Sequence, residues 1–257
     1  MGIPCMAVLE GFFRNREERI LFLDYDGTLA PFQKDRSRAF PYEGVRGRLE
    51  RLHLQGVELV FVTGRNPREI PLFLELPFPV EVWGAHGGEH LTPGGEIRKI
   101  PLPPGQETFF RRVGEAMERL HADLVEYKSF SVAFHLRPLG DTEARRFRKA
   151  LEEFDLPAKE AGLEKAFFDG GIEYRSPLTG KDKALDKVLA KRKQPFFAAY
   201  FGDDATDEDA FKALRGRGVS FLVRSRWRPT WANWWITPPE EVLGILDLFA
   251  LWTEKRC

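Results

Sequence analysis

Short apolar runs alternate along the chain with stretches whose apolar residues recur at helical spacing. Before residue 103 and after residue 178, most of these runs end directly in a polar or glycine-containing cluster. Buried parallel strands have this pattern, because a strand covered by helices on both faces has no polar side. We therefore expect strands at Ile20–Leu23, Val57–Val62, Val80–Trp83, Phe197–Phe201 and Val219–Val223.

Helical spacing between those runs completes the pattern of an α/β fold. Strands that alternate with helices favour a largely parallel sheet, here a Rossmann-like core. Leu49 and Leu52 lie on one face of a predicted helix, and Gly56 ends that helix. Helices are expected up to about Arg19 and at Val45–Gln55, Asn66–Leu74, Lys181–Lys191, Thr206–Leu214 and Glu240–Leu251.

Between residues 104 and 177 the pattern changes to pairs of short strands with two helices. This arrangement predicts a small α+β module inserted into the α/β core. We expect domains at 1–103 together with 178–257 for the core, and at 104–177 for the inserted module. The module's elements are predicted at Glu107–Ala122, Leu124–Lys128, Ser131–Arg137, Thr142–Phe154, Lys165–Asp169 and Gly171–Arg175.

Three polar clusters follow predicted core strands: DYDGT (24–28), TGR (63–65) and GDDATD (202–207). In an open parallel sheet, ligands bind beyond the carboxyl ends of the strands. Crowded carboxylates repel one another, so a hard divalent cation such as Mg²⁺ would hold them ionised. An aspartate there can act as a nucleophile, and a second one can transfer protons. The alternative for each cluster alone is ordinary turn chemistry.

These residues carry a resemblance to a known superfamily. LDYDGTL (23–29), FVTGR (61–65), a downstream lysine and GDDATDEDAF (202–211) resemble the four motifs of the haloacid dehalogenase (HAD) superfamily of phosphatases. The form of the last motif is typical of the trehalose-6-phosphate phosphatases. GAHGGE (84–89) and VEYKSFSVAFHLR (125–137) are similar to that family's loop after the third strand and to its cap segment. The resemblance runs from about Arg19 to the C-terminus and implies a HAD core with an inserted α+β cap.

Carried over by position, the resemblance implies a role for each catalytic residue. Asp24 would be the nucleophile and Asp26 the general acid/base, while Thr63 and the amides after it would hydrogen-bond the phosphoryl group. Mg²⁺ would be held by Asp24, the backbone carbonyl of Asp26, and Asp203, with Asp207 as a metal-side or neighbouring acid. A role for Asp204 is left open.

The phosphate-binding lysine has two candidates. The family pattern is close to E-x-R-P-x-G-x-x-K-G, whereas this chain has EYRSPLTGKDK (173–183). Lys181 keeps the spacing of eight residues from Glu173 and opens a predicted helix, whose N-terminus favours a phosphate. We favour Lys181 over Lys183, although Asp182 replaces the usual glycine.

The same resemblance identifies candidate substrate-binding residues. Alternate residues of a strand share a face, so polar side chains on adjoining strands could meet phosphate or sugar hydroxyls. The alternative is a solvated sheet face, or a structural histidine in the case of His86 and His135. The candidates are Arg65, His86, Glu126, Lys128, His135, Arg137, Glu173 and Arg175.

The resemblance implies an Mg²⁺-dependent enzyme that hydrolyses trehalose 6-phosphate to trehalose and phosphate through an aspartyl-phosphate. Two alternatives stay open. The substrate could be another sugar phosphate, such as sucrose 6-phosphate or a mannosyl- or glucosyl-3-phosphoglycerate. The protein could also be a sugar-phosphate sensor without turnover.

Composition limits the classes of binding partner and the cellular location that we expect. The 257 residues carry 39 Lys+Arg and 39 Asp+Glu, so the chain lacks the positive excess of a general nucleic-acid binder. We expect core packing and a short last strand, rather than nucleic-acid binding, from the Trp-rich segment 224–239. The longest apolar stretch, Val242–Trp252, is interrupted by Asp247 and is shorter than the roughly 20 residues of a membrane span.

The N-terminus does not have the pattern of a signal peptide, and the two cysteines, Cys5 and Cys257, lie at opposite ends of the chain. Such a pair cannot form a small disulfide framework, so a reducing compartment is the simpler assumption. We expect a cytoplasmic protein, and a monomer.

Overall fold

The computed structural model describes residues 6–33, 35–168, 170–193 and 195–254. Cys5, Cys257 and Asp169, the last residue of one predicted strand, lie outside the described residues. The chain forms two compact units. The first comprises Met1–Lys99 and Gly180–Cys257, and the second comprises Ile100–Thr179.

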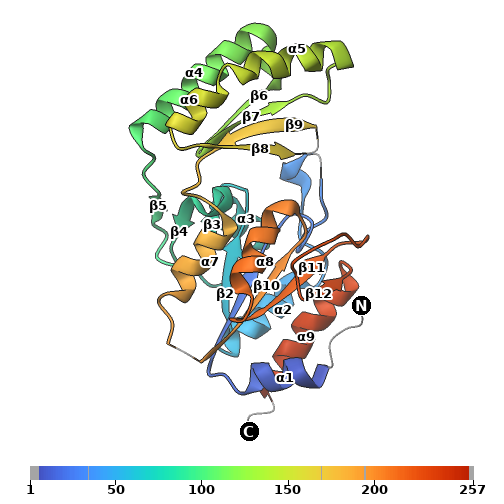
Figure 1. Ribbon diagram of the computed structural model, residues 1–257. Helices are drawn as coiled ribbons and strands as arrows, with labels where there is room; N and C mark the ends of the chain where they lie inside the picture. Colours follow the sequence, from blue (N-terminus) through green and yellow to red (C-terminus); the bar gives the residue numbers. More distant parts are fainter. Residues whose placement is uncertain (1–5, 34, 169, 194, 255–257) are drawn as a thin grey trace. The chain divides into compact units, whose positions relative to one another are not determined.

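The first unit is built on an eight-stranded sheet with the order β12-β11-β10-β1-β2-β3-β4-β5 (Figure 1). The six strands from β12 to β3 pair in parallel, and β4 and β5 complete the sheet antiparallel. The strands are β1 (Glu18–Leu23), β2 (Glu58–Val62), β3 (Glu81–Gly84), β4 (Glu89–Leu91), β5 (Ile97–Lys99), β10 (Phe196–Gly202), β11 (Val219–Val223) and β12 (Trp234–Ile236).

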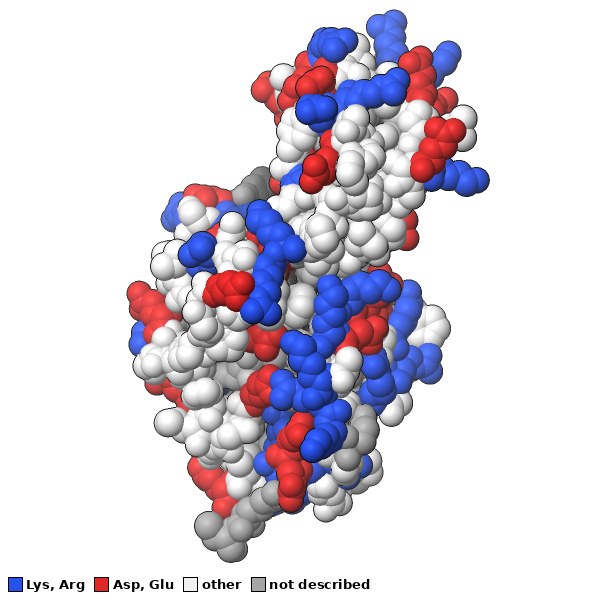
Figure 2. Space-filling view, turned by 90° about the vertical axis from the view of Figure 1, so that its left-hand side faces the viewer, with Lys and Arg blue, Asp and Glu red and all other residues white. Residues whose placement is uncertain are grey.

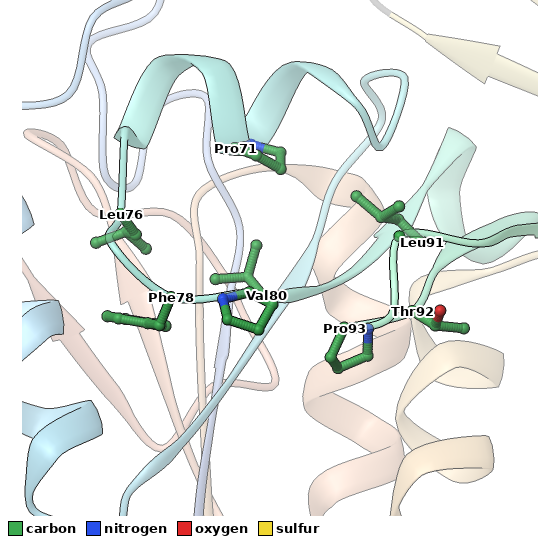
Figure 3. Close-up of a pocket in the computed structure, with 9 residues that line it drawn as sticks. Pro71, Leu76, Phe78, Val80, Leu91, Thr92 and Pro93 are labelled. Carbon is green, nitrogen blue, oxygen red and sulfur yellow. The ribbon is translucent and has the colours of Figure 1, made fainter.

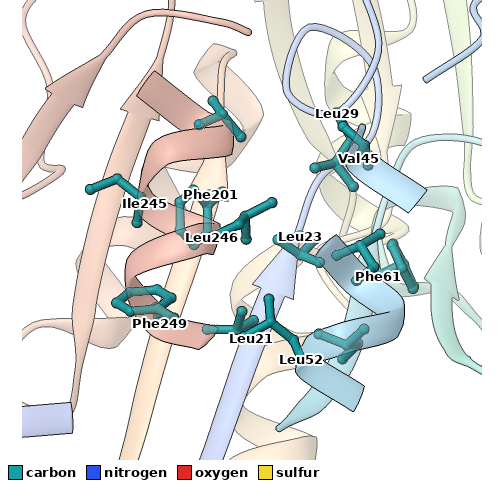
Figure 4. Packing of buried hydrophobic residues seen from close by; sticks show 14 of the residues in the cluster. Leu21, Leu23, Leu29, Val45, Leu52, Phe61, Phe201, Ile245, Leu246 and Phe249 are labelled. Atoms are coloured by element: carbon teal, nitrogen blue, oxygen red, sulfur yellow. The ribbon is translucent and has the colours of Figure 1, made fainter. Parts of the chain in front are cut away.

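Helices cover both faces of this sheet, so the apolar residues of its central strands are buried on either side. Leu21 and Leu23 pack toward one face, against the helices shown with them in Figure 4. Ile20 and Phe22 pack toward the other face. The first face is covered by α1 (Met6–Arg14), α2 (Val45–Leu54) and α9 (Glu240–Glu254), and the second by α7 (Lys181–Leu189) and α8 (Glu208–Leu214). The short helix α3 (Glu69–Leu74) follows β2.

The second unit is a four-stranded antiparallel sheet with the order β6-β7-β9-β8 and helices on one face. Val132 and Phe134 of β7 belong to the buried cluster shared with the helices, so the alternate residues Ser131, Ala133 and His135 face the opposite side. The elements are α4 (Pro104–His121), β6 (Val125–Lys128), β7 (Ser131–His135), α5 (Asp141–Glu152), α6 (Asp155–Glu160), β8 (Glu164–Phe168) and β9 (Gly171–Arg175).

The α/β core with an inserted α+β unit confirms the predicted fold class, but several elements differ from expectation. The first helix ends at Arg14 rather than near Arg19, because Glu18 already pairs with Phe196 in the sheet. The predicted helix 206–214 begins with a 3₁₀ turn over Ala205–Asp207. The hairpin β4–β5 is not predicted, since each of its strands is only three residues long.

The Trp-rich segment contributes less to the core than expected. Trp234 of β12 packs against the buried cluster, and β12 is the short last strand that the sequence predicts. Trp227, Trp231 and Trp235 are instead about half exposed. Hydrophobicity alone cannot separate these cases: Trp227 and Trp231 lie in the irregular segment before β12, and Trp235 alternates with the packed Trp234 along the strand.

The surface and the helices agree with the composition. Basic and acidic side chains both occur widely on the face in Figure 2, in keeping with equal numbers of the two. No helix in the described part of the chain is long and apolar enough to cross a membrane.

Candidate active site

The three motif-bearing strands are neighbours at the centre of the first unit's sheet. β1 lies between β10 and β2, and both pairings are parallel. Their carboxyl ends therefore meet at one edge of the sheet. The amide of Asp24 donates to the carbonyl of Phe201 at 2.9 Å, which joins the first and last motifs directly.

Asp24, Asp203 and Asp207 form an acidic cluster at this edge. One carboxylate oxygen from each lies within 4.8 Å of the others. Burial, opposed by Lys181 and assisted by repulsion from Asp207, raises the pKa of Asp24 to about 7. Burial and repulsion from Asp24 and Asp207 raise the pKa of Asp203 to about 9. Burial and mutual repulsion thus oppose ionisation of Asp24 and Asp203. A bound metal cation would stabilise their ionised forms, so the cluster is chemically suited to one.

Gly27 permits the close approach of Asp203 to the first motif. Its φ of +77° lies in the left-handed region, which glycine adopts without strain. A Cβ atom at this position would lie 2.1 Å from the Asp203 Oδ2 atom. The glycine of DYDGT therefore both makes the turn and leaves room for a carboxylate.

Asp207 is a fully buried hydrogen-bonding centre within the cluster. Its Oδ1 atom accepts from the Tyr200 hydroxyl at 2.6 Å and from Lys181 Nζ at 2.7 Å. Its Oδ2 atom accepts from the amides of Asp203 at 3.1 Å and Asp204 at 3.0 Å. Asp207 thus fixes the turn that carries Asp203. Tyr200 is missing from the sequence prediction because its strand, FFAAYFG, is otherwise apolar and has the pattern of pure core.

The structure brings Lys181, and not Lys183, to the acids. Lys181 is the first residue of α7, it is buried, and its Nζ atom lies 3.1 Å from Asp24 Oδ2. Burial would lower the pKa of its ammonium, but Asp207 and Asp24 outweigh burial and raise it. Lys183 is half exposed and pairs with Asp182 at 3.2 Å. Lys181 is therefore a permanent cation between two carboxylates.

The second motif supplies a buried hydroxyl and a tight turn. Thr63 is 1% exposed, and its Oγ1 atom accepts from the amide of Arg65 at 3.2 Å. The His86 amide donates to the Thr63 carbonyl at 2.9 Å. A Cβ atom at Gly64 would lie 2.7 Å from the His86 ring, so that ring lies directly against the glycine. His86 is thus brought to the second motif.

The Arg65 side chain points to the first motif. Its Nε and Nη2 atoms donate to the two carboxylate oxygens of Asp26, at 2.7 and 2.6 Å. Nη1 donates to Glu69 at 3.0 Å, and the guanidinium has no exposed surface. The sequence does not predict this pairing.

The candidate residues of the second unit lie together on the sheet face opposite its helices. Lys128 Nζ and Ser131 Oγ both donate to Glu173 Oε1, at 3.0 and 2.7 Å. His135 Nε2 lies 2.8 Å from Glu126 Oε2. Direct pairing of Ser131 with Arg175 and of Glu126 with Ala133 shows that these strands share one register and one face.

The remaining two candidates of that unit are Arg175, at the end of β9, and Arg137, just after β7. Arg175 pairs with Glu164 of the neighbouring strand at 3.1 Å. Arg137 follows β7, and its Cγ atom would be 2.4 Å from a Cβ at Gly170, so its stem packs on that turn. The polar face thus combines two carboxylates, an ammonium, an imidazole and a hydroxyl.

A separate apolar pocket of about 170 Å³ lies beside β3 and β4 in the first unit (Figure 3). None of its nine lining residues is charged, so it offers no group for acid/base or metal chemistry. It is lined by Pro71, Leu76, Phe78, Pro79, Val80, Leu91, Thr92, Pro93 and Gly95.

Comparison with known proteins gives a consistent result. The family model described as trehalose-phosphatase matches residues 22–233. The chain is 27% identical over 262 residues to "Probable trehalose-phosphate phosphatase E" of Arabidopsis thaliana, covering 93% of this chain and 72% of that one.

Solved structures agree on the fold. A trehalose-6-phosphate phosphatase of Aspergillus fumigatus superposes with a TM-score of 0.74 at 24% identity, covering 98% of this chain and 99% of that one. A haloacid dehalogenase-like hydrolase of Bacteroides thetaiotaomicron superposes with a TM-score of 0.63 at 14% identity, covering 90% and 99%. The core therefore has the HAD fold, and with the family match over most of its length the chain belongs to the trehalose-phosphatase family.

Proposed function

We propose that the protein is an Mg²⁺-dependent phosphatase that hydrolyses trehalose 6-phosphate to trehalose and phosphate. The observation that carries this proposal is the cluster of Asp24, Asp203 and Asp207 with the buried Lys181 at the carboxyl edge of the sheet. The family match supports the substrate, because two of the similar proteins named above, from Arabidopsis thaliana and Aspergillus fumigatus, are described as trehalose-phosphate phosphatases.

Mg²⁺ fits the donor set. Two buried carboxylates, Asp24 and Asp207, and the partly buried Asp203 lie together, and hard oxygen ligands of this kind are those that Mg²⁺ takes. Asp24, Asp203 and the backbone carbonyl of Asp26 would hold the ion, with Asp207 beside them. When bound, the ion neutralises charge on the phosphoryl oxygens.

Each catalytic residue of the chain then has its own step in the reaction. A carboxylate oxygen of Asp24 attacks phosphorus and the P–O bond to the sugar breaks, while Asp26 gives its proton to the departing sugar oxygen. Asp26 next takes a proton from water, which attacks the aspartyl-phosphate, releases phosphate and restores Asp24. Lys181, Thr63 and the amides of the second motif hold the phosphoryl oxygens throughout.

The polar sheet face of the second unit is proposed to bind the sugar. Glu126 and Glu173 are acceptors for sugar hydroxyls, and Lys128 is a donor already held in place by Glu173. A preorganised set of this kind binds a polar ligand without first having to order its own side chains.

Binding of Mg²⁺ is expected to release protons. The raised pKa values of Asp24, about 7, and Asp203, about 9, mean that both carboxyls are partly or wholly protonated at pH 7 in the metal-free protein. Since the ion requires ionised ligands, its affinity should increase as pH rises from 6 to 9. Calorimetric titration in buffers of different ionisation enthalpy measures the protons released. A pH-independent affinity with no proton release would contradict this prediction.

Phosphate release from a panel of sugar phosphates, with Mg²⁺ and with EDTA, tests the proposed function. We expect the highest kcat/KM for trehalose 6-phosphate and no release in EDTA. A clear preference for sucrose 6-phosphate or a glycosyl-3-phosphoglycerate would keep the chemistry and change the substrate. Binding of a sugar phosphate without any release would favour a sensor.

A further inference from the structure

All three nitrogens of the Arg65 guanidinium donate hydrogen bonds within the first unit. Two of its nitrogens bind both carboxylate oxygens of Asp26, and the third binds Glu69. Its Nη2 atom also donates to the carbonyl of Arg36 at 2.8 Å. The side chain has no exposed surface, and four of its five N–H groups donate to these acceptors, which leaves a single N–H group on the buried Nη1 atom.

Aromatic rings fix the guanidinium in this position. Its central carbon lies 5.2 Å from the ring centroid of Tyr25 and 4.8 Å from that of Phe73. Tyr25 is itself held, because its hydroxyl donates to the Ala39 carbonyl at 2.7 Å. To make a two-point contact with another partner, Arg65 would have to leave both rings and some of its four hydrogen-bond acceptors. Cation–π contacts are stronger when they are desolvated, as these are, so this rearrangement is costly.

A two-point contact fixes more than a distance. Paired N–H···O bonds from one guanidinium set the plane of the carboxylate as well as its position, which a lysine ammonium cannot do. Asp26 is about one-fifth exposed, and its second cationic neighbour, Arg36, is more distant at 3.6 Å. The orientation of Asp26 therefore depends chiefly on Arg65.

We infer that Arg65 is a positioning residue for the acid/base Asp26, and that its side chain does not bind the substrate's phosphate. The inference rests on the proposed function, in which Asp26 protonates the departing sugar oxygen. The arginine of the TGR motif, which follows β2, would thus hold in place the proton-transferring aspartate that follows β1.

This role has a consequence that general damage to the site would not have. The sugar leaves as an alkoxide unless Asp26 protonates it, whereas p-nitrophenolate is a stable anion that leaves without a proton. The value of kcat/KM covers the steps up to departure of the leaving group. A misplaced Asp26 should therefore lower kcat/KM for the sugar phosphate far more than for p-nitrophenyl phosphate.

The test is Arg65→Lys, which keeps the charge and removes the two-point contact. A displaced catalytic group can cost about 100-fold, so we expect kcat/KM for trehalose 6-phosphate to fall by about 100-fold, and that for p-nitrophenyl phosphate by less than about fivefold. Arg68→Lys is the matched control, because Arg68 is exposed three residues along the chain. Its values should equal those of the wild type for both substrates.

A double variant tests whether Arg65 acts through Asp26. Asp26→Asn combined with Arg65→Lys should lose no more activity on the sugar phosphate than Asp26→Asn alone, since coupled residues are non-additive. If Arg65→Lys does not fold by circular dichroism, Phe73→Leu replaces it. That change loosens the guanidinium at a half-buried ring and should shift the two substrates in the same unequal way.

An equal fall for both substrates, or full additivity in the double variant, would overturn the positioning role. A wild-type protein that hydrolyses another sugar phosphate, but not trehalose 6-phosphate, would contradict only the proposed substrate. The comparison with p-nitrophenyl phosphate is then made with the sugar phosphate that is hydrolysed. Absence of hydrolysis of every substrate would contradict the proposed function and, with it, the role of Arg65.

Discussion

Replacing Asp24 by asparagine is expected to abolish turnover while leaving the protein folded. The amide cannot attack phosphorus to form an acyl-phosphate, and loss of a nucleophile lowers kcat by about ten-thousand-fold or more. The fold should survive because Asp24 is one of three mutually repelling acids, and Lys181 keeps its 2.7 Å contact with Asp207 when Asp24 loses its charge.

The measurement is phosphate release in Mg²⁺, together with the thermal unfolding midpoint of the metal-free protein. Asp209→Asn is the matched control, because Asp209 lies in the last motif but is half exposed and pairs with Lys212. It should keep wild-type turnover. Appreciable activity in folded Asp24→Asn would show that another group is the nucleophile.

Replacing Lys181 by methionine should affect both activity and stability. Lys181 is the buried cation between Asp24 and Asp207, so its removal leaves buried carboxylates without a counter-charge. Removing one partner of such a pair costs about 3 to 5 kcal/mol, and loss of a group that stabilises the transition state costs about 100- to 1,000-fold in kcat. Protonation of Asp24 relieves part of the stability loss at low pH, so the destabilisation should increase with pH.

Lys183→Met is the control that separates the two candidate lysines. Lys183 is half exposed and pairs with Asp182 on the surface, so its removal should change the free energy of unfolding by less than about 1 kcal/mol. Urea unfolding without metal and phosphate release with Mg²⁺ provide the two readouts. A larger loss of activity in Lys183→Met than in Lys181→Met would reverse the assignment.

The sequence predicts the central strands and the meeting of the three motifs because both follow from simple rules. Buried parallel strands are apolar throughout, and their carboxyl ends share one edge of the sheet. The spacing from Glu173 also singles out Lys181. These features depend on position along the chain and on which strands neighbour each other, so pattern and resemblance are sufficient to find them.

Which side chains pair with each other in the folded protein is not predictable in the same way. The pairing of Arg65 with Asp26 joins residues 39 positions apart, and it depends on a cage of aromatic rings that only the folded chain assembles. Tyr200 is hidden for a related reason, since a hydroxyl on a buried ring is indistinguishable from core until its acceptor, Asp207, is placed. The hairpin β4–β5 is a different case: the turn sequence Pro93-Gly94-Gly95 is a hairpin signal, but strands of three residues are too short to show a pattern.

The most direct test of the account is to trap the covalent intermediate. The protein is mixed with Mg²⁺ and trehalose 6-phosphate carrying radioactive phosphorus, quenched in acid during turnover, and mapped by peptide. We expect label on the peptide that contains Asp24, and none in EDTA or in Asp24→Asn. Release of radioactive phosphate without any label on the chain, or label on a different residue, would contradict it.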